Sequence, residues 1–188
     1  MEAGNLLRGK RGLVMGVAND KSIAWGIAKA AANQGAEIAF SFQMEGFGKR
    51  LAPLADSIGS NIMIECDVAK KGAVDNCFAE LATYWPTIDF VVHALAFSDK
   101  KELKGAYMDT SRDNFANTMI VSAYSFTEVA RAASTMMPAG GALVTLSFLG
   151  AQRTTPNYNV MGIAKAALEA SVRYLAVDLG GQNIRVNA

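Results

Sequence analysis

The sequence is poor in the residues on which several specialised protein classes depend. Its 188 residues include two cysteines, Cys66 and Cys77, one histidine, His93, and four prolines. Two thiols do not form a disulfide framework, and their spacing matches neither a metal site nor a redox motif. We therefore expect no metal centre, and a protein that works in the reduced cytoplasm.

An excess of charge of one sign and long apolar runs are also missing. The formal net charge is +1, which gives no reason to expect a nucleic-acid or membrane partner. No stretch approaches the roughly 18 apolar residues of a membrane span, and Met1–Arg11 has no apolar run of signal-peptide length. With 51% apolar and 19% charged residues, the chain has an ordinary globular balance, and we expect residues 1–188 to form one domain.

What is present is a regular alternation of short apolar runs and helical patterns. The runs predict strands at Gly12–Val17, Glu37–Phe42, Asn61–Cys66, Ile88–Leu95, Gly141–Ser147 and Asn183–Asn187. Helices are expected at Ser22–Asn33 (where Ile23, Ile27, Ala30 and Ala31 share a face), Glu45–Ile58, Lys70–Tyr84, Arg112–Met136 and Tyr158–Leu179. Because the strands are continuously apolar, we predict an α/β fold of Rossmann type, with a doubly wound parallel sheet covered by helices on both faces.

The turn after the first strand has the pattern Gly-x5-Ser-x3-Gly, from Gly16 to Gly26. A dinucleotide pyrophosphate needs backbone amides at a helix N-terminus and no side chain in the way. Gly16 ends the strand, Ser22 is placed to cap the helix, and Gly26 is expected to let the helix approach the sheet. The alternative is a plain strand-to-helix turn with a serine N-cap.

Polar residues follow the second and third strands. Gln43 stands where NAD-binding folds usually carry an acidic residue for the ribose, and no arginine lies at positions 40–44, so NADH is favoured over NADPH. Asp67 can accept a hydrogen bond from the adenine amino group, and Val68 supplies a backbone amide. A surface glutamine and an aspartate that caps the next helix are the alternatives.

Small residues follow the fourth strand, in the stretch His93–Phe97. Such residues at the carboxyl end of a central strand let a ligand lie against the backbone. His93 is interpreted as a structural hydrogen-bonding residue, because nothing nearby in the sequence is a nucleophile for it to activate.

The pattern Ser147-Phe148 followed by Tyr158-x6-Lys165 is the strongest chemical signal. Residues seven apart lie on nearly the same helix face, and lysine can stretch back toward the tyrosine. A phenol near an ammonium has its ionised form favoured, and either form can hold a developing oxyanion. By spacing alone, a surface helix with an incidental tyrosine and lysine remains the alternative.

Together these motifs resemble the bacterial enoyl-(acyl-carrier-protein) reductases, a divergent branch of the short-chain dehydrogenase/reductase superfamily. The resemblance runs from Leu7 to Ala188, and its most specific part is Pro156–Lys165, because the common branch uses Tyr-x3-Lys. It implies that NADH delivers hydride to the β-carbon of a trans-2-enoyl thioester on acyl carrier protein, that Tyr158 holds the enolate oxygen and that Lys165 holds the nicotinamide ribose. The implied cofactor contacts are Gly16, Ser22, Ile23, Gln43, Asp67, Val68, Leu95 and Lys165, with Ser98 and Phe148 beside the substrate.

Two departures from this family pattern stand out. Phe148 occupies a position, ten residues before the tyrosine, where the family usually has a second tyrosine. The family also continues beyond Ala188 into a closing turn, a mobile helix over the acyl chain and a last strand, so we expect the 188 residues alone to lack the substrate lid and much of the carrier-protein docking surface and to turn over poorly.

Other functions remain open at this stage. One alternative is a carbonyl reductase or alcohol dehydrogenase of the same superfamily, against which the Tyr-x6-Lys spacing argues. Another is a non-catalytic dinucleotide-binding paralogue. By analogy with related folds, a homotetramer formed through Arg112–Met136 and Tyr158–Leu179 is expected.

Overall fold

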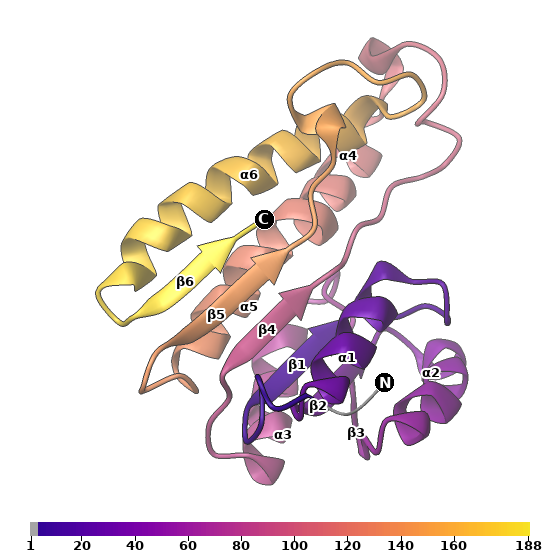
Figure 1. Ribbon diagram of the computed structural model, residues 1–188. Helices are drawn as coiled ribbons and strands as arrows, with labels where there is room; N and C mark the ends of the chain where they lie inside the picture. Colours follow the sequence, from indigo (N-terminus) through magenta and orange to yellow (C-terminus); the bar gives the residue numbers. More distant parts are fainter. Residues whose placement is uncertain (1–3) are drawn as a thin grey trace.

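A parallel sheet of six strands forms the centre of the molecule, in the order β3-β2-β1-β4-β5-β6 (Figure 1). The computed structural model describes residues 4–188. The strands are β1 Arg11–Met15, β2 Glu37–Phe42, β3 Ile62–Glu65, β4 Phe90–His93, β5 Gly141–Thr145 and β6 Ile184–Asn187. All neighbouring pairs run parallel, which confirms the predicted Rossmann-like sheet.

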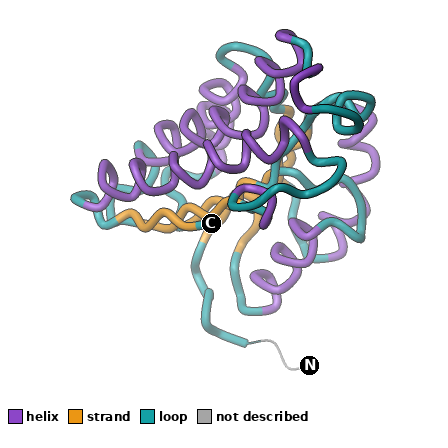
Figure 2. The backbone as a smooth tube through the Cα atoms, turned by 90° about the horizontal axis from the view of Figure 1, so that it is seen from above, coloured by secondary structure: helices purple, strands orange, loops and turns teal. Residues whose placement is uncertain are grey.

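Helices lie on both sides of the sheet (Figure 2). They are α1 Ile23–Asn33, α2 Glu45–Ser57, α3 Ala73–Tyr84, α4 Arg112–Met119, α5 Ser125–Ser134 and α6 Asn159–Gly180. α1 and α2 pack on one face, around Val14, Phe40 and Val92. α3, α5 and α6 pack on the other, around Leu13, Val91 and Leu143.

The carboxyl ends of β2, β1 and β4 meet at one edge of the sheet. Met15 at the end of β1 is aligned with Ser41 on one side and with His93 on the other. The chain proceeds outward from β1 to β2 and β3, and then crosses back to β4 on the opposite side of β1. Ligands of open parallel sheets bind in the crevice at such a switch point.

Four of the predicted strands end earlier than expected. Gly16 and Val17 lie beyond β1, Cys66 lies beyond β3, Ala94 and Leu95 lie beyond β4, and Leu146–Ser147 lies beyond β5. These residues are apolar or small because they line cavities at the edge of the sheet rather than because they continue it. Apolar character alone does not distinguish a residue that continues a strand from one that lines a cavity.

The predicted helix Arg112–Met136 is not one continuous α-helix. A π-helical turn, Ile120–Tyr124, separates α4 from α5. A π turn widens the helix by one residue and changes which side chains face the sheet. Here it belongs to the wall of a cavity, as described below.

The inward face of α1 also differs from the prediction. Its buried residues are Ala24, Trp25, Ala28 and Ala31, whereas the side chain of Ile23 is 68% exposed. Trp25 packs on Phe40 of β2, with ring centroids 6.3 Å apart. The bulk of the indole therefore sets the rotation of the helix.

Candidate active site

Gly16 lets β1 and the segment after β4 approach closely. Its φ of +99° lies in the left-handed region, and a Cβ at this position would collide with the carbonyl group of Ala94. Only glycine meets both demands without strain. A glycine is therefore required at position 16, where the predicted dinucleotide turn begins.

Ser22 stands at the N-cap position of α1 but does not cap it. Its hydroxyl instead accepts hydrogen bonds from the amides of Ala18 (3.0 Å) and Asn19 (3.1 Å), and so orders the loop. The first-turn amides of α1 consequently have no side-chain cap and remain available to an anion. The expectation for Gly26 is wrong, because this residue is exposed and a Cβ there would contact nothing within 4 Å.

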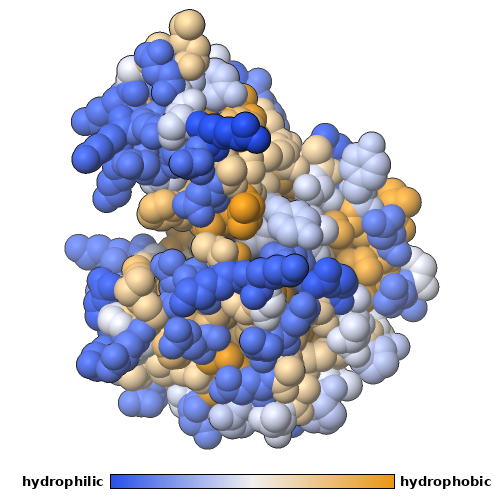
Figure 3. Space-filling model, turned by 180° about the vertical axis from the view of Figure 1, so that it is seen from behind, coloured by the Kyte–Doolittle hydropathy of each residue, from blue (hydrophilic) through white to orange (hydrophobic). Residues whose placement is uncertain are grey.

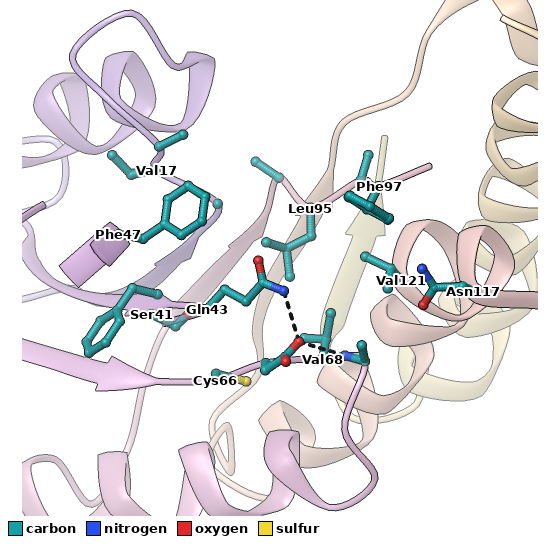
Figure 4. Close-up of a pocket in the computed structure, with 17 residues that line it drawn as sticks. Val17, Ser41, Gln43, Phe47, Cys66, Val68, Leu95, Phe97, Asn117 and Val121 are labelled. Carbon is teal, nitrogen blue, oxygen red and sulfur yellow. Dashed lines mark hydrogen bonds between the residues drawn. The ribbon is translucent and has the colours of Figure 1, made fainter. Parts of the chain in front are cut away.

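A cavity of about 320 Å³ opens at the carboxyl ends of β1, β2 and β3 (Figure 4). Figure 3 shows a notch between two lobes on this side of the molecule. The cavity is lined by Gly16–Ala18, Ser41–Gln43, Phe47, Cys66–Ala69, Ala94–Phe97, Asn117 and Val121. It brings together five of the predicted cofactor contacts, Gly16, Gln43, Asp67, Val68 and Leu95.

The polar end of this cavity is built from Gln43 and Asp67. The amide Nε2 of Gln43 donates to Oδ1 of Asp67 at 3.2 Å, and the same oxygen accepts the amide of Ala69 at 3.2 Å. Asp67 does not cap α3, which begins at Ala73 after Gly72 at the N-cap. Both side chains therefore lie where an adenosine could meet them.

A second cavity, of about 430 Å³, lies beside the first. Its walls are Ile23, Ala94–Ala96, Leu146–Phe148, Thr155, Tyr158 and Lys165. Ala94, Leu95 and Ala96 line both cavities. We call these three residues the shared wall.

Tyr158 lies at the N-cap of α6, between Asn157 and Asn159, which both have positive φ. Its ring contacts Phe148 edge-on, with centroids 4.8 Å apart. Burial raises the pKa of the Tyr158 phenol. Burial thus opposes the expected effect of the lysine and favours the neutral phenol, which can donate a hydrogen bond.

Lys165 lies on the inward face of α6 and is only 6% exposed. Its Nζ donates to the carbonyl oxygen of Leu146 at 2.7 Å. Burial lowers the pKa of this ammonium. The hydrogen bond to Leu146 uses one N–H group of Lys165 to hold the residue after β5. The remaining N–H groups are left for a ligand in the second cavity.

His93 is fully buried and belongs to neither cavity. Its Nδ1 lies 2.9 Å from the hydroxyl of Thr145, and its Nε2 lies 2.8 Å from that of Ser125. Burial, together with the charge of Lys165, lowers the pKa of His93 to about 3. The ring is neutral, and the structural interpretation agrees with this geometry.

Ser98 does not lie where the sequence placed it. Its buried hydroxyl exchanges hydrogen bonds with Asn114 and Thr118, and it lines neither cavity. Phe97, one residue earlier, lines the first cavity instead. The side chain of Ser98 thus holds the loop to α4.

A family model described as "Enoyl-(Acyl carrier protein) reductase" matches residues 16–188. This chain belongs to the enoyl-(acyl-carrier-protein) reductase family. The relative named enoyl-(acyl-carrier-protein) reductase (NADH) 2, from Rhizobium meliloti (strain 1021), is 58% identical over 183 residues, which cover 97% of this chain and 68% of the relative.

Solved structures agree with the family. The chain is similar to the enoyl-(acyl-carrier-protein) reductase of Anaplasma phagocytophilum, crystallised with NAD, with a TM-score of 0.97, 57% identity, and coverage of 100% of this chain and 72% of that one. It is also similar to the Bacillus cereus enzyme, crystallised with NADP⁺ and indole naphthyridinone, with a TM-score of 0.95, 46% identity, and coverage of 97% and 72%. The alternative of a carbonyl reductase therefore does not hold at the level of family.

Several cavity residues of this reductase were missed from the sequence. They are Phe47, Asn117, Val121 and Thr155. Asn117 and Val121 are four residues apart, on the helix and π turn, and could have been paired as neighbours on one helix face. Which helix face meets the cavity depends on packing against the sheet, and the sequence carries no signal for it.

Two further properties concern residues 4–188 only. No three histidine, cysteine, aspartate or glutamate side chains in this part of the chain gather as a metal site would require. No helix in it is both long and apolar enough to cross a membrane.

Proposed function

We propose that this protein reduces the C2–C3 double bond of a trans-2-enoyl thioester carried on acyl carrier protein, with NADH as the reductant. One observation carries the proposal. Tyr158 and Lys165 line the second cavity, which shares a wall with the first cavity, where Gly16, Gln43 and Asp67 lie. The relatives that are named NADH reductases support the same reaction.

The residues present fit a dinucleotide. Gly16 allows the close backbone approach, the small side chains of Ala94 and Ala96 leave room along the shared wall, and the uncapped amides of α1 suit a pyrophosphate. At the adenosine end a carboxylate, Asp67, and no arginine line the cavity. A 2′-phosphate would find no bidentate partner there, which favours NADH over NADPH.

The reaction needs a donor at the oxygen where charge develops. When bound, NADH supplies a hydride to the β-carbon of the enoyl group. The electron pair of the double bond then moves toward the thioester carbonyl, and the neutral phenol of Tyr158 donates a hydrogen bond to that oxygen. A proton from the solvent, added at the α-carbon, then completes the saturated thioester and leaves NAD⁺. Lys165 keeps a positive charge beside the site and offers its free donors to the ribose.

The assay that tests the proposal offers NADH to the full-length enzyme with a crotonyl thioester and, separately, with a β-ketoacyl thioester. We expect NADH oxidation with the enoyl substrate and almost none with the ketone. Oxidation with the ketone alone would overturn the proposal, and no oxidation with either would favour the non-catalytic paralogue.

Phe148 provides a prediction about the missing second hydroxyl. Its ring is 47% exposed and contacts Tyr158, so Phe148→Tyr adds a hydroxyl at the open side without moving the ring. If this hydroxyl adds one hydrogen bond to the reacting thioester, kcat/KM rises about fivefold. Steady-state kinetics with two acyl chain lengths measure this, and unchanged rate, affinity and chain-length preference would show that the substitution is silent.

We also propose a homotetramer that uses the helical face of α5, the π turn and α6. The exposed large apolar side chains on the π turn and α6 are Ile120, Tyr124, Ile163, Tyr174 and Val177. Light scattering is expected to give four times the chain mass. Val177→Asp should lower this mass, whereas Leu6→Asp, at an 85% exposed position away from these helices, should not; equal masses for both variants would contradict the assignment of this face.

Two further proposals concern the domain organisation and the cellular location. We infer that residues 1–188 act as a single dinucleotide-binding domain, because one sheet carries both cavities. The cytoplasm is proposed as the location because both cysteines, Cys66 and Cys77, are free and buried. Fractionation of cells, with the enzyme detected by antibody, tests the latter.

A further inference from the structure

The shared wall, Ala94–Ala96, is held by few hydrogen bonds of its own. The amide of Ala94 donates to Met15 of β1 at 3.1 Å. Within residues 4–188, the backbone groups of Leu95 and Ala96 form no hydrogen bond with other backbone groups. A segment that leaves the sheet and borders two cavities therefore needs another support if it is to keep its position.

The π turn supplies a hydrogen-bonding group at the far end of this segment. The hydroxyl of Ser122 accepts the amide of Phe97 at 3.0 Å and donates to the carbonyl oxygen of Phe97 at 3.1 Å. Ser122 is 0% exposed. One buried hydroxyl thus satisfies both backbone groups of the residue that follows the shared wall.

A second hydrogen bond joins the near end of the segment to the same turn. Nε2 of His93 lies 2.8 Å from the hydroxyl of Ser125, and that hydroxyl donates its only proton to the carbonyl oxygen of Val121 at 2.7 Å. Nε2 must therefore carry the hydrogen and donate it to Ser125. Nδ1 is then an acceptor that lies 2.9 Å from the hydroxyl of Thr145. That hydroxyl also lies 3.1 Å from the carbonyl oxygen of His93, and its single proton can go to only one of these two acceptors.

The two hydrogen-bonded ends enclose the shared wall. Ser122 and Ser125 are three residues apart, and the π turn brings both hydroxyls to the sheet side, where each is 0% exposed. Val121, between α4 and these serines, lines the first cavity itself (Figure 4). π turns within α-helices are frequently found at functional sites, and here the turn carries the serine that binds the end of a cavity wall.

We propose that Ser122, Ser125 and His93 are positioning residues that hold the shared wall against the π turn and thereby set the affinity of the enzyme for its dinucleotide. They do not touch the reacting atoms. The clearance at the shared wall is small, since Ala94 already lies so close to Gly16 that a methyl group cannot be added between them. A wall released at Phe97 would shift into, or away from, the space that the dinucleotide needs.

The test is Ser122→Ala in the full-length enzyme, with NADH binding titrated directly by fluorescence. We expect the Kd for NADH to rise roughly 5- to 10-fold, as the loss of a buried hydrogen bond implies. The KM for NADH should rise in parallel, while kcat at saturating NADH changes less than about twofold, because Tyr158 and Lys165 are not disturbed. The amide of Phe97 should also exchange its hydrogen faster.

Ser134→Ala is the matched control. This serine lies at the end of α5, and its hydroxyl donates only to the carbonyl oxygen of Arg131 in its own helix. Its Kd should equal that of the wild-type enzyme. A folded Ser122→Ala with unchanged Kd, or an equal rise in Ser134→Ala, overturns the proposal.

Ser122→Cys repeats the comparison if the alanine variant does not fold, because a thiol nearly preserves the volume but is a weak hydrogen-bonding group. The proposal depends on the proposed function only in taking a dinucleotide as the ligand. A wild-type enzyme that binds NADH but reduces no enoyl thioester would overturn the proposed reaction while the Kd comparison still decides the positioning role. Failure of the wild-type enzyme to bind NADH would overturn both.

Discussion

Tyr158→Phe is expected to lower kcat for an enoyl thioester by roughly 10²- to 10³-fold, the usual cost of removing a donor to a developing oxyanion. Burial raises the pKa of the phenol and so favours its neutral form, which can donate a hydrogen bond. The ring contact with Phe148 does not involve the hydroxyl and should persist. The Kd for NADH should therefore change little, and the loss should appear in kcat rather than in binding.

Tyr84→Phe is the appropriate control for this variant. Tyr84 is 55% exposed at the end of α3 and lines neither cavity. The Tyr84→Phe substitution removes a hydroxyl that lies outside both cavities, so kcat and KM should remain unchanged. Full activity in Tyr158→Phe, measured beside this control, would show that another group stabilises the enolate.

Gly16→Ala is expected to have the second large effect, on both stability and cofactor binding. The new methyl group would meet the carbonyl group of Ala94, and the backbone at φ +99° is unfavourable for alanine. Backbone strain and overpacking together should lower the free energy of unfolding by roughly 2–4 kcal/mol. Urea titration measures this loss, and NADH titration of the folded fraction should show a Kd raised by about tenfold or more, since the displaced segment includes the shared wall.

Gly26→Ala separates this effect from glycine replacement in general. Gly26 lies in α1, exposed, with nothing within 4 Å of an added Cβ. Alanine there should raise the free energy of unfolding by roughly 0.5–1 kcal/mol, because it restricts the unfolded chain and favours the helix. Equal destabilisation by both substitutions would contradict the close approach at Gly16.

The predictions that succeeded depend on local patterns. Continuously apolar strands alternating with helical stretches are specified by hydrophobic burial within each segment, and this pattern led to the doubly wound sheet. The spacing between Tyr158 and Lys165 is likewise local, because one helix carries the lysine and begins directly after the tyrosine. Both residues line one cavity, and their catalytic roles stay a prediction.

The predictions that failed concern where a side chain points. Ser22 has the identity and position of a helix cap, but two loop amides compete for its hydroxyl. The family resemblance placed Ser98 beside the substrate, but its hydroxyl forms hydrogen bonds with Asn114 and Thr118 and lines neither cavity. In both cases the hydrogen-bond partner of the hydroxyl depends on which groups lie near it in the folded protein. The spacing of residues along the sequence does not predict these neighbours.

The parallel α/β sheet and the requirement for a glycine after β1 could be inferred from residue identity and short-range patterns alone. The tertiary structure alone decided the rotation of α1, the π turn within the expected helix and the use of His93, Ser122 and Ser125 to support the shared wall. The rotation of α1 arises from the packing of Trp25 on Phe40 of β2. The support of the shared wall arises from hydrogen bonds between residues that lie 25 to 52 positions apart along the chain. Such contacts exist only once the sheet has assembled.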